Sequence, residues 1–377
     1  MEKPIRVLQI LGIVANGGVE AVIMNYYRNM NKNKIQFDFV VHNDADENYI
    51  KEILSMGAKV YKVTPYNQNV FKFMYEIYHI IKSNQYQIVH FNMNALSGFA
   101  LLPAYLAGAK IRILHNHTTD SKEEKLRSLI KRVLRPFAKL FANQYWACSK
   151  LAAEWMYGKN ALTNGKVTII NNAINIEKFK FNKEKREQLR KELGIENCFV
   201  IGHVGRFVKT KNHEFLIDVF NEVLKQRNNA KLLLIGDGNL KSLMEAKVKN
   251  LGIEKAVIFL GVRNDVADLY NAMDVFVLPS LYEGLPVVGV EAQTNGLPFI
   301  CSDRVTNEIL LTDNIRLLSL QQYKTEWCDA ILNAERKKIA NKKDSLLKNF
   351  DIKSESKKLE ALYLSFIRRY YEKYYRK

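Results

Sequence analysis

The segment VFVLPSLYEGLPVVGVEAQTNGLPFICS (275–302) contains, in order, a strand, a polar loop, a helix and a second strand. The strands are predicted at VFVLP (275–279) and PFICS (298–302), because both are short apolar runs. The helix is predicted to begin at Pro286, since proline is tolerated at a helix start. This order is typical of a βαβ unit, in which the strands are parallel and helices cover the sheet.

The same alternation extends over most of the chain. Further strands are predicted at 5–11, 37–42, 59–63, 87–91, 111–115, 167–170, 199–205, 231–236 and 257–261. Helices are predicted near 18–30, 69–82, 97–107, 123–141, 149–157, 213–226, 240–250, 264–271 and 286–295. Two such series predict an α/β protein with two Rossmann-like, doubly wound parallel-sheet domains that face each other across a cleft.

The domain boundaries follow from a polar, highly charged stretch between the two series. We expect an N-terminal domain over 1–175, a linker over 176–197 and a C-terminal domain over 198–352. The last segment, 353–377, is predicted to be an amphipathic helix that packs back on the N-terminal domain, with an apolar side made of Leu359, Leu362, Tyr363 and Phe366. Ligands of such sheets bind beyond the carboxyl ends of the strands.

Composition is that of an ordinary soluble protein, apart from the charge. The 377 residues are 47% hydrophobic and 25% charged, and no apolar run approaches the length of a membrane span or a signal peptide. The four cysteines lie far apart without a CxxC pair, which argues against a zinc site or a disulfide framework and favours a cytoplasmic location. They are Cys148, Cys198, Cys301 and Cys328.

Lysine and arginine exceed aspartate and glutamate by 57 to 39, a formal net charge of +18. This excess favours an anionic partner, such as a phosphorylated ligand, an acidic membrane surface or a nucleic acid. Nucleic acid is the weakest of the three, because the sequence has no zinc-finger spacing, no aromatic RNA-recognition signature and no arginine-rich tail.

Two glycine-containing segments follow predicted strands and are candidates for phosphate binding. In GIVANGGVE (12–20), Gly17 and Gly18 open a helix, where backbone N–H groups favour an anion. The spacing is not GxGxxG, which argues against a dinucleotide enzyme and leaves a tight turn as the alternative. In GRFVKTK (205–211), Arg206 and Lys211 can clamp a pyrophosphate, although two solvated charges explain the pattern as well.

The loop and helix of the opening segment carry two carboxylates. Glu283 lies in the loop, and Glu291 lies about a turn and a half inside the helix, so that the two can address different parts of one ligand. A carboxylate can accept two hydroxyl hydrogen bonds, which suits a ribose diol or a sugar ring. The free N–H groups of Val287 and Val288 are suited to phosphate. The alternative, a buried acid and a helix cap, is equally compatible with these residues.

These motifs together carry a family resemblance. The Glu-x7-Glu pattern of YEGLPVVGVEA, with GRFVKTK, GGVE, IGDGNL (235–240), NNAINIEKFKF (171–181) and WACSK (146–150), resembles the retaining glycosyltransferases of family 4, which have the GT-B fold. The segments IRILHNHTTDS and WACSKLAAEWMYG are most similar to the branch that builds bacterial capsular and extracellular polysaccharide. The resemblance implies transfer of a hexose or N-acetylhexosamine from a UDP-linked donor to a saccharide or lipid-linked acceptor, with no metal or cofactor.

The resemblance also implies roles for single residues. Arg206 and Lys211 would bind and stabilise the diphosphate, Glu291 would hold the ribose, and Glu283 would contact the donor sugar. His117 would lie beside that sugar, and we prefer it to His115 because its place beyond the strand end is expected to expose it to the cleft. The donor-binding set is expected to comprise Gly17, Gly18, Gly205, Val262, Arg263, Gly284, Leu285, Val287, Val288 and Glu291.

One departure from the family pattern is Asn212, where many members carry glycine, although asparagine tolerates similar backbone angles. The segment 123–144 alternates apolar and basic residues at helical spacing, which suits either an anionic bilayer on the inner face of the cell membrane or a core-facing helix with a solvated basic face. Two other functions stay open: a related transferase with a small-molecule acceptor, and a non-catalytic nucleotide-sugar or glycan-binding protein.

Overall fold

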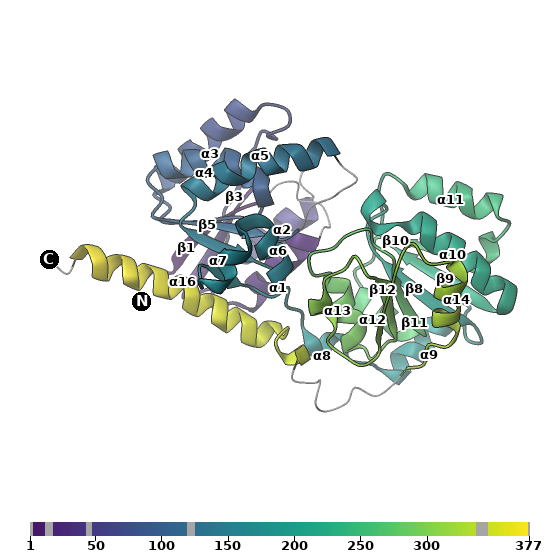
Figure 1. Ribbon diagram of the computed structural model, residues 1–377. Helices are drawn as coiled ribbons and strands as arrows, with labels where there is room; N and C mark the ends of the chain where they lie inside the picture. The colour runs from purple at the N-terminus through teal and green to yellow at the C-terminus, as the bar shows by residue number, and fades with distance from the viewer. Residues whose placement is uncertain (1–2, 12–17, 43–46, 119–124, 337–345, 376–377) are drawn as a thin grey trace. The chain divides into compact units, whose positions relative to one another are not determined.

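The computed structural model describes residues 3–11, 18–42, 47–118, 125–336 and 346–375. The chain forms two compact units (Figure 1). The first comprises Met1–Ala173 and Ile352–Lys377, and the second comprises Ile174–Asp351. Each unit is built on a parallel sheet, so both predicted Rossmann-like folds are confirmed.

The first unit holds a seven-stranded sheet in the order β3-β2-β1-β4-β5-β6-β7, in which all neighbours are parallel. Its strands are β1 (Ile5–Ile10), β2 (Ile35–His42), β3 (Val60–Val63), β4 (Ile88–Phe91), β5 (Ile111–Asn116), β6 (Gln144–Ala147) and β7 (Val167–Ile169). Its helices are α1 (Gly18–Asn29), α2 (Glu47–Ser55), α3 (Val70–Asn84), η1 (Asn94–Ser97), α4 (Gly98–Leu106), α5 (Lys125–Phe141), α6 (Lys150–Tyr157), α7 (Lys159–Thr163) and α16 (Ile352–Tyr375).

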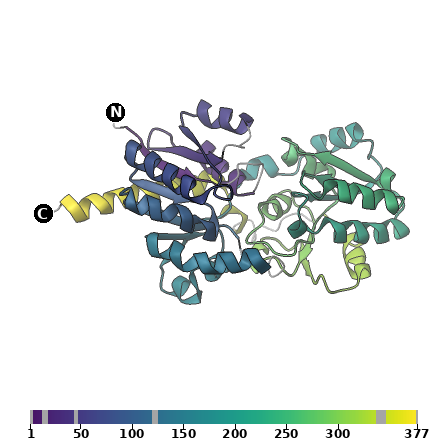
Figure 2. The ribbon, with the colours of Figure 1, turned by 90° about the horizontal axis from the view of Figure 1, so that it is seen from above.

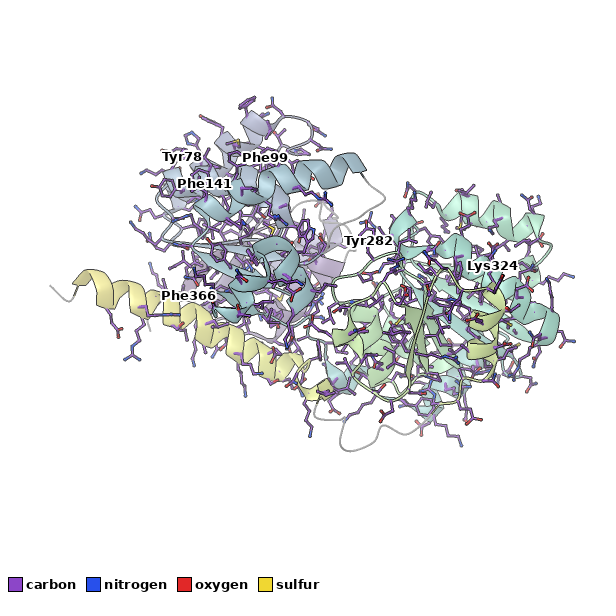
Figure 3. The ribbon with its side chains drawn as sticks, viewed as in Figure 1. Tyr78, Phe99, Phe141, Tyr282, Lys324 and Phe366 are labelled. Atoms are coloured by element: carbon purple, nitrogen blue, oxygen red, sulfur yellow. The ribbon has the colours of Figure 1, made fainter. Side chains whose placement is uncertain are left out.

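Side chains alternate between the two faces of this sheet, as strand geometry requires. Helices α3, α4 and α5 lie together over one face, where Tyr78, Phe99 and Phe141 are labelled in Figure 3. On that face the strands present apolar side chains such as Leu8 and Val89. The residues between them on the same strands face the layer of α1 and α16, and several of these are polar.

The last helix completes the apolar core of the first unit. Helix α16 runs beside α1 (Figures 1 and 2) and buries Leu359, Tyr363 and Phe366, all at most 5% exposed. The ring of Phe366 lies 6.1 Å from that of Trp146 on β6. Burial of three such side chains contributes several kcal/mol to the first unit.

The second unit holds a six-stranded parallel sheet in the order β10-β9-β8-β11-β12-β13. Its strands are β8 (Phe199–Val204), β9 (Ala230–Ile235), β10 (Val257–Gly261), β11 (Val275–Leu278), β12 (Phe299–Ser302) and β13 (Ile315–Leu318). Its helices are α8 (Ile176–Phe179), α9 (Lys183–Glu192), η2 (Lys209–Lys211), α10 (His213–Gln226), α11 (Lys241–Asn250), η3 (Glu254–Ala256), α12 (Val266–Ala272), α13 (Val287–Thr294), η4 (Asn307–Ile309) and α14 (Lys324–Leu332).

The predicted strands all exist, but the structure adds β6 and β13, which sequence analysis missed. Both contain only four residues, but so do β3, β4, β11 and β12, which were predicted, so length alone does not account for the omission. The charged stretch 176–197, expected as a linker, contains α8 and α9. Helix α9 consists mostly of charged and polar residues, so its sequence has no apolar pattern that predicts a packed helix. It nevertheless packs on α12.

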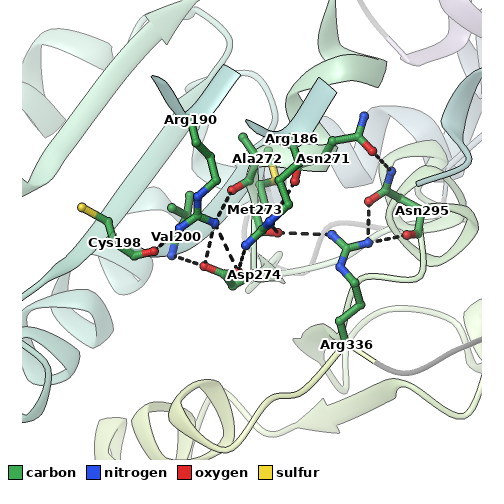
Figure 4. Close-up of polar contacts among 10 residues, drawn as sticks. All are labelled: Arg186, Arg190, Cys198, Val200, Asn271, Ala272, Met273, Asp274, Asn295 and Arg336. Carbon is green, nitrogen blue, oxygen red and sulfur yellow. Dashed lines mark hydrogen bonds and ion pairs between the residues drawn. The ribbon is translucent and has the colours of Figure 1, made fainter. Parts of the chain in front are cut away.

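Ion pairs, together with the buried side chain of Leu189, attach α9 to the second sheet (Figure 4). Asp274, at the start of β11, accepts hydrogen bonds from Arg186 and Arg190 of α9 and from the backbone N–H of Val200, the last at 2.8 Å. Arg190 also donates to the carbonyls of Ala272 and Cys198. Because Arg190 is only 6% exposed, its charge needs these partners in order to be buried.

None of the helices in the described ranges has the length and apolar character needed to cross a membrane.

Candidate functional site

The order of strands in the second sheet reverses between β8 and β11. From β8 the chain builds the sheet outward through β9 and β10, and it then returns to place β11 on the other side of β8. The loops that follow β8 and β11 therefore diverge at their carboxyl ends, which is where open α/β sheets bind ligands. These two loops contain six of the predicted site residues, namely Gly205, Arg206, Lys211, Glu283, Gly284 and Leu285.

A partly buried ion pair joins the two loops. The ammonium group of Lys211, at the end of η2, donates to the Oε1 atom of Glu283, and the side chains are only 18% and 17% exposed. The hydroxyl of Ser280 donates to the same oxygen at 3.0 Å, and the N–H of Leu281 donates to the carbonyl of Thr210 at 2.8 Å. Sequence analysis predicted both charges but not that they contact each other.

Arg206 differs from Lys211 in having a free charge. Its side chain is exposed and makes no ion pair with a carboxylate of the described residues. Gly205, just before it, is tightly packed, since a Cβ atom there would lie 3.0 Å from the Nε2 atom of His203 and 3.3 Å from Lys211. The loop can therefore present the Arg206 guanidinium and the backbone at Gly205 to a ligand, with no side chain at position 205 in the way.

Two glycines of IGDGNL bring the loop after β9 against the loop after β8. Gly236 and Gly238 have φ of +138° and +156°, and a Cβ atom on them would lie 2.2 Å and 2.6 Å from the carbonyl oxygens of Gly205 and Phe207. Only glycine fits such close approaches. Asn212 adopts φ 56° and ψ 43°, so the expectation that asparagine tolerates a glycine-like conformation here is confirmed.

Glu291 lies in α13, behind the loop that carries Glu283. Its Oε2 atom accepts a hydrogen bond of 2.9 Å from the hydroxyl of Tyr270 on α12. Burial raises the pKa of Glu291 from 4.5 to about 7, although the Tyr270 hydrogen bond and the charge of Lys178 act in the opposite direction. Near neutral pH the folded chain therefore contains both the protonated and the ionised form of Glu291.

The remaining predicted donor-binding residues lie on neighbouring elements of the second unit. Val287 and Val288 are the first two residues of α13, with Pro286 as N-cap, while Gly284 and Leu285 are buried in the loop before it. Val262 and Arg263 follow β10 and are exposed. Arg263 makes a bidentate contact with Asp265, at 2.8 and 2.6 Å, which holds its guanidinium close to its own loop.

Two predicted residues belong to the loop between β1 and α1. Gly17 lies outside the described residues. Gly18 is the first residue of α1, and a Cβ atom there would meet nothing within 4 Å. Packing within the described residues therefore gives no reason for glycine at position 18.

His117 follows β5, as predicted, but the expectation that it is exposed is wrong. It is only 7% exposed, and His115 is 3% exposed. Two asparagines of the loop after β4 cover His117: Asn92 contacts its Nε2 atom at 3.1 Å, and Asn94 accepts from its backbone N–H at 2.6 Å. The thiol of Cys148 donates to its carbonyl. Burial lowers the pKa of His117 to about 3, so the ring is neutral.

Four residues that matter for this geometry were missed by sequence analysis: Ser280, Tyr270, Asn92 and Asn94. Each contacts a predicted site residue through a side chain or the backbone, and no local motif marks such a role. The available signal was position, since Ser280, Asn92 and Asn94 lie within three residues of a strand end. Within the described part of the chain, no three His, Cys, Asp or Glu side chains are grouped so that they could hold a metal ion.

Comparison with known proteins identifies the family to which the chain belongs. A sequence profile described as Glycosyltransferase Family 4 matches residues 16–178, and one described as Glycosyl transferases group 1 matches residues 185–349. A Bacillus subtilis protein named as the glycosyltransferase EpsF is 34% identical over 338 residues, covering 87% of each chain. The chain belongs to glycosyltransferase family 4. CapH of Staphylococcus aureus, named as a capsular polysaccharide biosynthesis glycosyltransferase, is 26% identical and covers 96% of this chain and 99% of its own.

Solved structures confirm the fold of this glycosyltransferase. The Anabaena protein Alr3699/HepE, crystallised with UDP-glucose, matches with a TM-score of 0.79 at 20% identity, over 96% of this chain and 99% of its own. The lipopolysaccharide galactosyltransferase WaaB matches with a TM-score of 0.66 at 18% identity, over 96% of this chain and 99% of its own. The GT-B fold is thus confirmed.

The raised pKa of Glu291 predicts how stability depends on pH. Below pH 4.5 the carboxyl is protonated in both the folded and the unfolded chain, and Glu291→Gln has little effect. Between pH 4.5 and about 7 the folded chain binds the proton more tightly, so that wild-type stability falls relative to the variant as pH rises. We expect Glu291→Gln to be more stable than wild type above pH 7 by up to about 3 kcal/mol. Urea unfolding of both proteins from pH 4 to 8 measures the difference, and a difference independent of pH would contradict the assignment.

Proposed function

We propose that this glycosyltransferase transfers a hexose or an N-acetylhexosamine from a UDP-linked donor to a saccharide or lipid-linked glycan, with retention of configuration, in cell-surface polysaccharide biosynthesis. The observation that carries the proposal is the contact of Lys211 with Glu283 at the diverging ends of β8 and β11. The names of similar proteins support the chemistry: one from Escherichia coli, 26% identical over 78% of this chain, is a UDP-galactose transferase acting on a GlcNAc-diphosphoundecaprenol acceptor.

In the proposed mechanism the charges of the loop after β8 stabilise the leaving diphosphate. Arg206 offers a planar fork of donors and Lys211 a mobile ammonium group. Positive charge placed where negative charge develops lowers the barrier, and this supplies the role that a metal has in other transferases. Glu283 neutralises the charge of Lys211 through their contact. An arriving diphosphate would share the Lys211 ammonium group, and the Glu283 carboxylate would then be free to accept from a sugar hydroxyl.

The neighbouring elements would bind the ribose, the base and the sugar of the donor. Glu291, when ionised, would accept both hydroxyls of the ribose, and the backbone near Val262 and Arg263 would contact the base. His117 of the first unit would contact the transferred sugar. With no enzymic nucleophile assigned, the acceptor hydroxyl attacks on the face from which the diphosphate leaves, and a phosphate oxygen takes its proton.

Thermal unfolding with nucleoside diphosphates tests the donor site. A ligand that binds only the folded chain raises the melting temperature by mass action. We expect UDP, at a hundredfold excess over its Kd and with EDTA present, to stabilise the protein by about 3 kcal/mol, more than GDP, ADP or TDP do. Glu291→Ala should abolish the shift because the ribose contacts are lost.

Each outcome of this panel separates the alternatives. A selective shift with UDP-sugar turnover supports the proposal, whereas a selective shift without turnover on any acceptor supports a non-catalytic binding protein. Turnover on soluble small alcohols alone supports a small-molecule acceptor. No shift with any diphosphate contradicts the UDP-linked donor.

We also propose that the enzyme acts in the cytoplasm, bound to the inner face of the membrane through α5. The helix exposes Val133, Phe137 and Leu140 at 56%, 54% and 71%, spaced so that they lie on one side. The adjoining α4 exposes Tyr105 and Leu106 at 53% and 60%. A helix that only covers the core would direct such side chains inward, as α5 does with Ala138, which is fully buried.

Vesicle binding tests the membrane proposal. Phe137→Glu with Leu140→Glu should weaken sedimentation with vesicles of phosphatidylglycerol at low salt by more than tenfold, since two buried apolar side chains are each worth roughly 1.5–3 kcal/mol. Leu243→Glu, at a side chain of α11 that is 59% exposed, is the matched control in the second unit and should have no effect. Wild-type protein that stays unbound to these vesicles would refute the proposal.

A further inference from the structure

The polar side chains between the first sheet and α16 form a connected chain of hydrogen bonds around His117. Asn92 contacts the Nε2 atom of His117 at 3.1 Å and Gln9 at 3.0 Å. Gln9 contacts the hydroxyl of Tyr363 on α16 at 3.3 Å, and that hydroxyl contacts the Nδ1 atom of His90 at 2.7 Å. All these side chains are at most 7% exposed.

The chain continues from His90 back to His117. The Nε2 atom of His90 lies 3.1 Å from the Nδ1 atom of His115. The ring of His115 lies against that of His117, with centroids 4.0 Å apart. The path therefore closes on itself, with β1, β4, β5 and α16 each supplying at least one member.

The direction of every hydrogen bond follows from one backbone carbonyl. The amide nitrogen of Asn92 lies 3.4 Å from the carbonyl of His90, which can only accept. The Oδ1 atom of Asn92 therefore faces His117, and the His117 Nε2 atom must carry a proton. The same amide nitrogen donates to Gln9, so Gln9 in turn donates to Tyr363.

The remaining protons are then determined. The Tyr363 oxygen accepts from Gln9, and among the described residues the acceptor within reach of its proton is the Nδ1 atom of His90, so the proton is donated there. The Nε2–H group of His90 then donates to the Nδ1 atom of His115, which places the proton of His115 on Nε2. All three histidines thus carry their proton on Nε2.

The surroundings keep these rings neutral. A cavity of about 20 Å³ adjoins the cluster, and its polar lining consists of Gln9, Tyr26, His90, His115, His117 and Tyr363. None of these is a carboxylate or a fixed cation. The other polar groups that contact His117 are Asn92, Asn94 and Cys148. Burial lowers the pKa of all three histidines, and the His115 Nε2–H group has no partner among the described residues, so one water in the cavity would satisfy it.

We infer that Asn92 is a positioning residue that fixes the proton of His117 on Nε2 and so presents Nδ1 as a hydrogen-bond acceptor to a hydroxyl of the transferred sugar. The inference rests on the proposed function for its substrate, while the proton positions stand on the contacts above. A neutral acceptor is suited to a hydroxyl, whereas a protonated ring offers only donors.

Nitrogen-15 NMR of histidine-labelled full-length protein tests the proton positions without any assay of activity. At pH 7 we expect His90, His115 and His117 to be neutral with the proton on Nε2, each assigned by its own substitution. Asn92→Leu should leave His117 as a mixture of both tautomers. A wild-type His117 that is protonated on Nδ1, or a variant with the wild-type tautomer, overturns the inference.

The pH profile of UDP-sugar turnover tests the consequence for catalysis. Asn92→Asp places a carboxylate against His117 and raises the pKa of that ring, so turnover should fall about tenfold for each pH unit below the new pKa and recover above it. Both proteins share the titration of Glu291 near pH 7, so the effect is measured as the ratio of Asn92→Asp turnover to wild-type turnover, which should fall as the pH decreases. Asn69→Asp adds the same charge at the exposed N-cap of α3 and should keep the wild-type profile. An Asn92→Asp profile parallel to wild type overturns the inference, whereas absence of turnover in wild type refutes the proposed function and leaves the NMR result to decide.

Discussion

The contact between Lys211 and Glu283 depends on one property of the second sheet, the reversal of strand order at β8 and β11. An order in which β8 and β11 were not neighbours would separate the loops that carry the two residues. The backbone supports this placement, because the loop after β8 is held by the loop after β9 through Gly236 and Gly238. A lysine held by a carboxylate is partly desolvated and already oriented, so less reorganisation is needed when a diphosphate arrives.

The first unit uses the same sheet order for a different purpose. The polar residues around His117 lie on the sheet face that α1 and α16 cover, and they form a neutral network instead of an ion pair. Tyr363 comes from the end of the chain, more than 240 residues after His117 in the sequence numbering. The last helix thus contributes both apolar burial and a hydrogen bond to the interior around the histidines.

Sequence analysis predicted both sheets and selected the loops after β8 and β11 as the candidate site, because strands of β-branched residues and loops of glycine and charge have local signals. It missed β6 and β13, and it could not find partners separated by many residues. The pairing of Lys211 with Glu283 spans 72 positions, and that of Tyr270 with Glu291 spans 21. It also treated a position beyond a strand end as exposed, whereas Asn92 and Asn94 bury His117.

The most direct test of the central claim is the rate of UDP release from UDP-linked hexoses and N-acetylhexosamines, measured in EDTA with Arg206→Ala and Lys211→Ala. If these cations stabilise the departing diphosphate, each variant should lose roughly 10²–10³ in turnover while its melting temperature stays near that of wild type. Near-normal turnover in both variants would contradict the account.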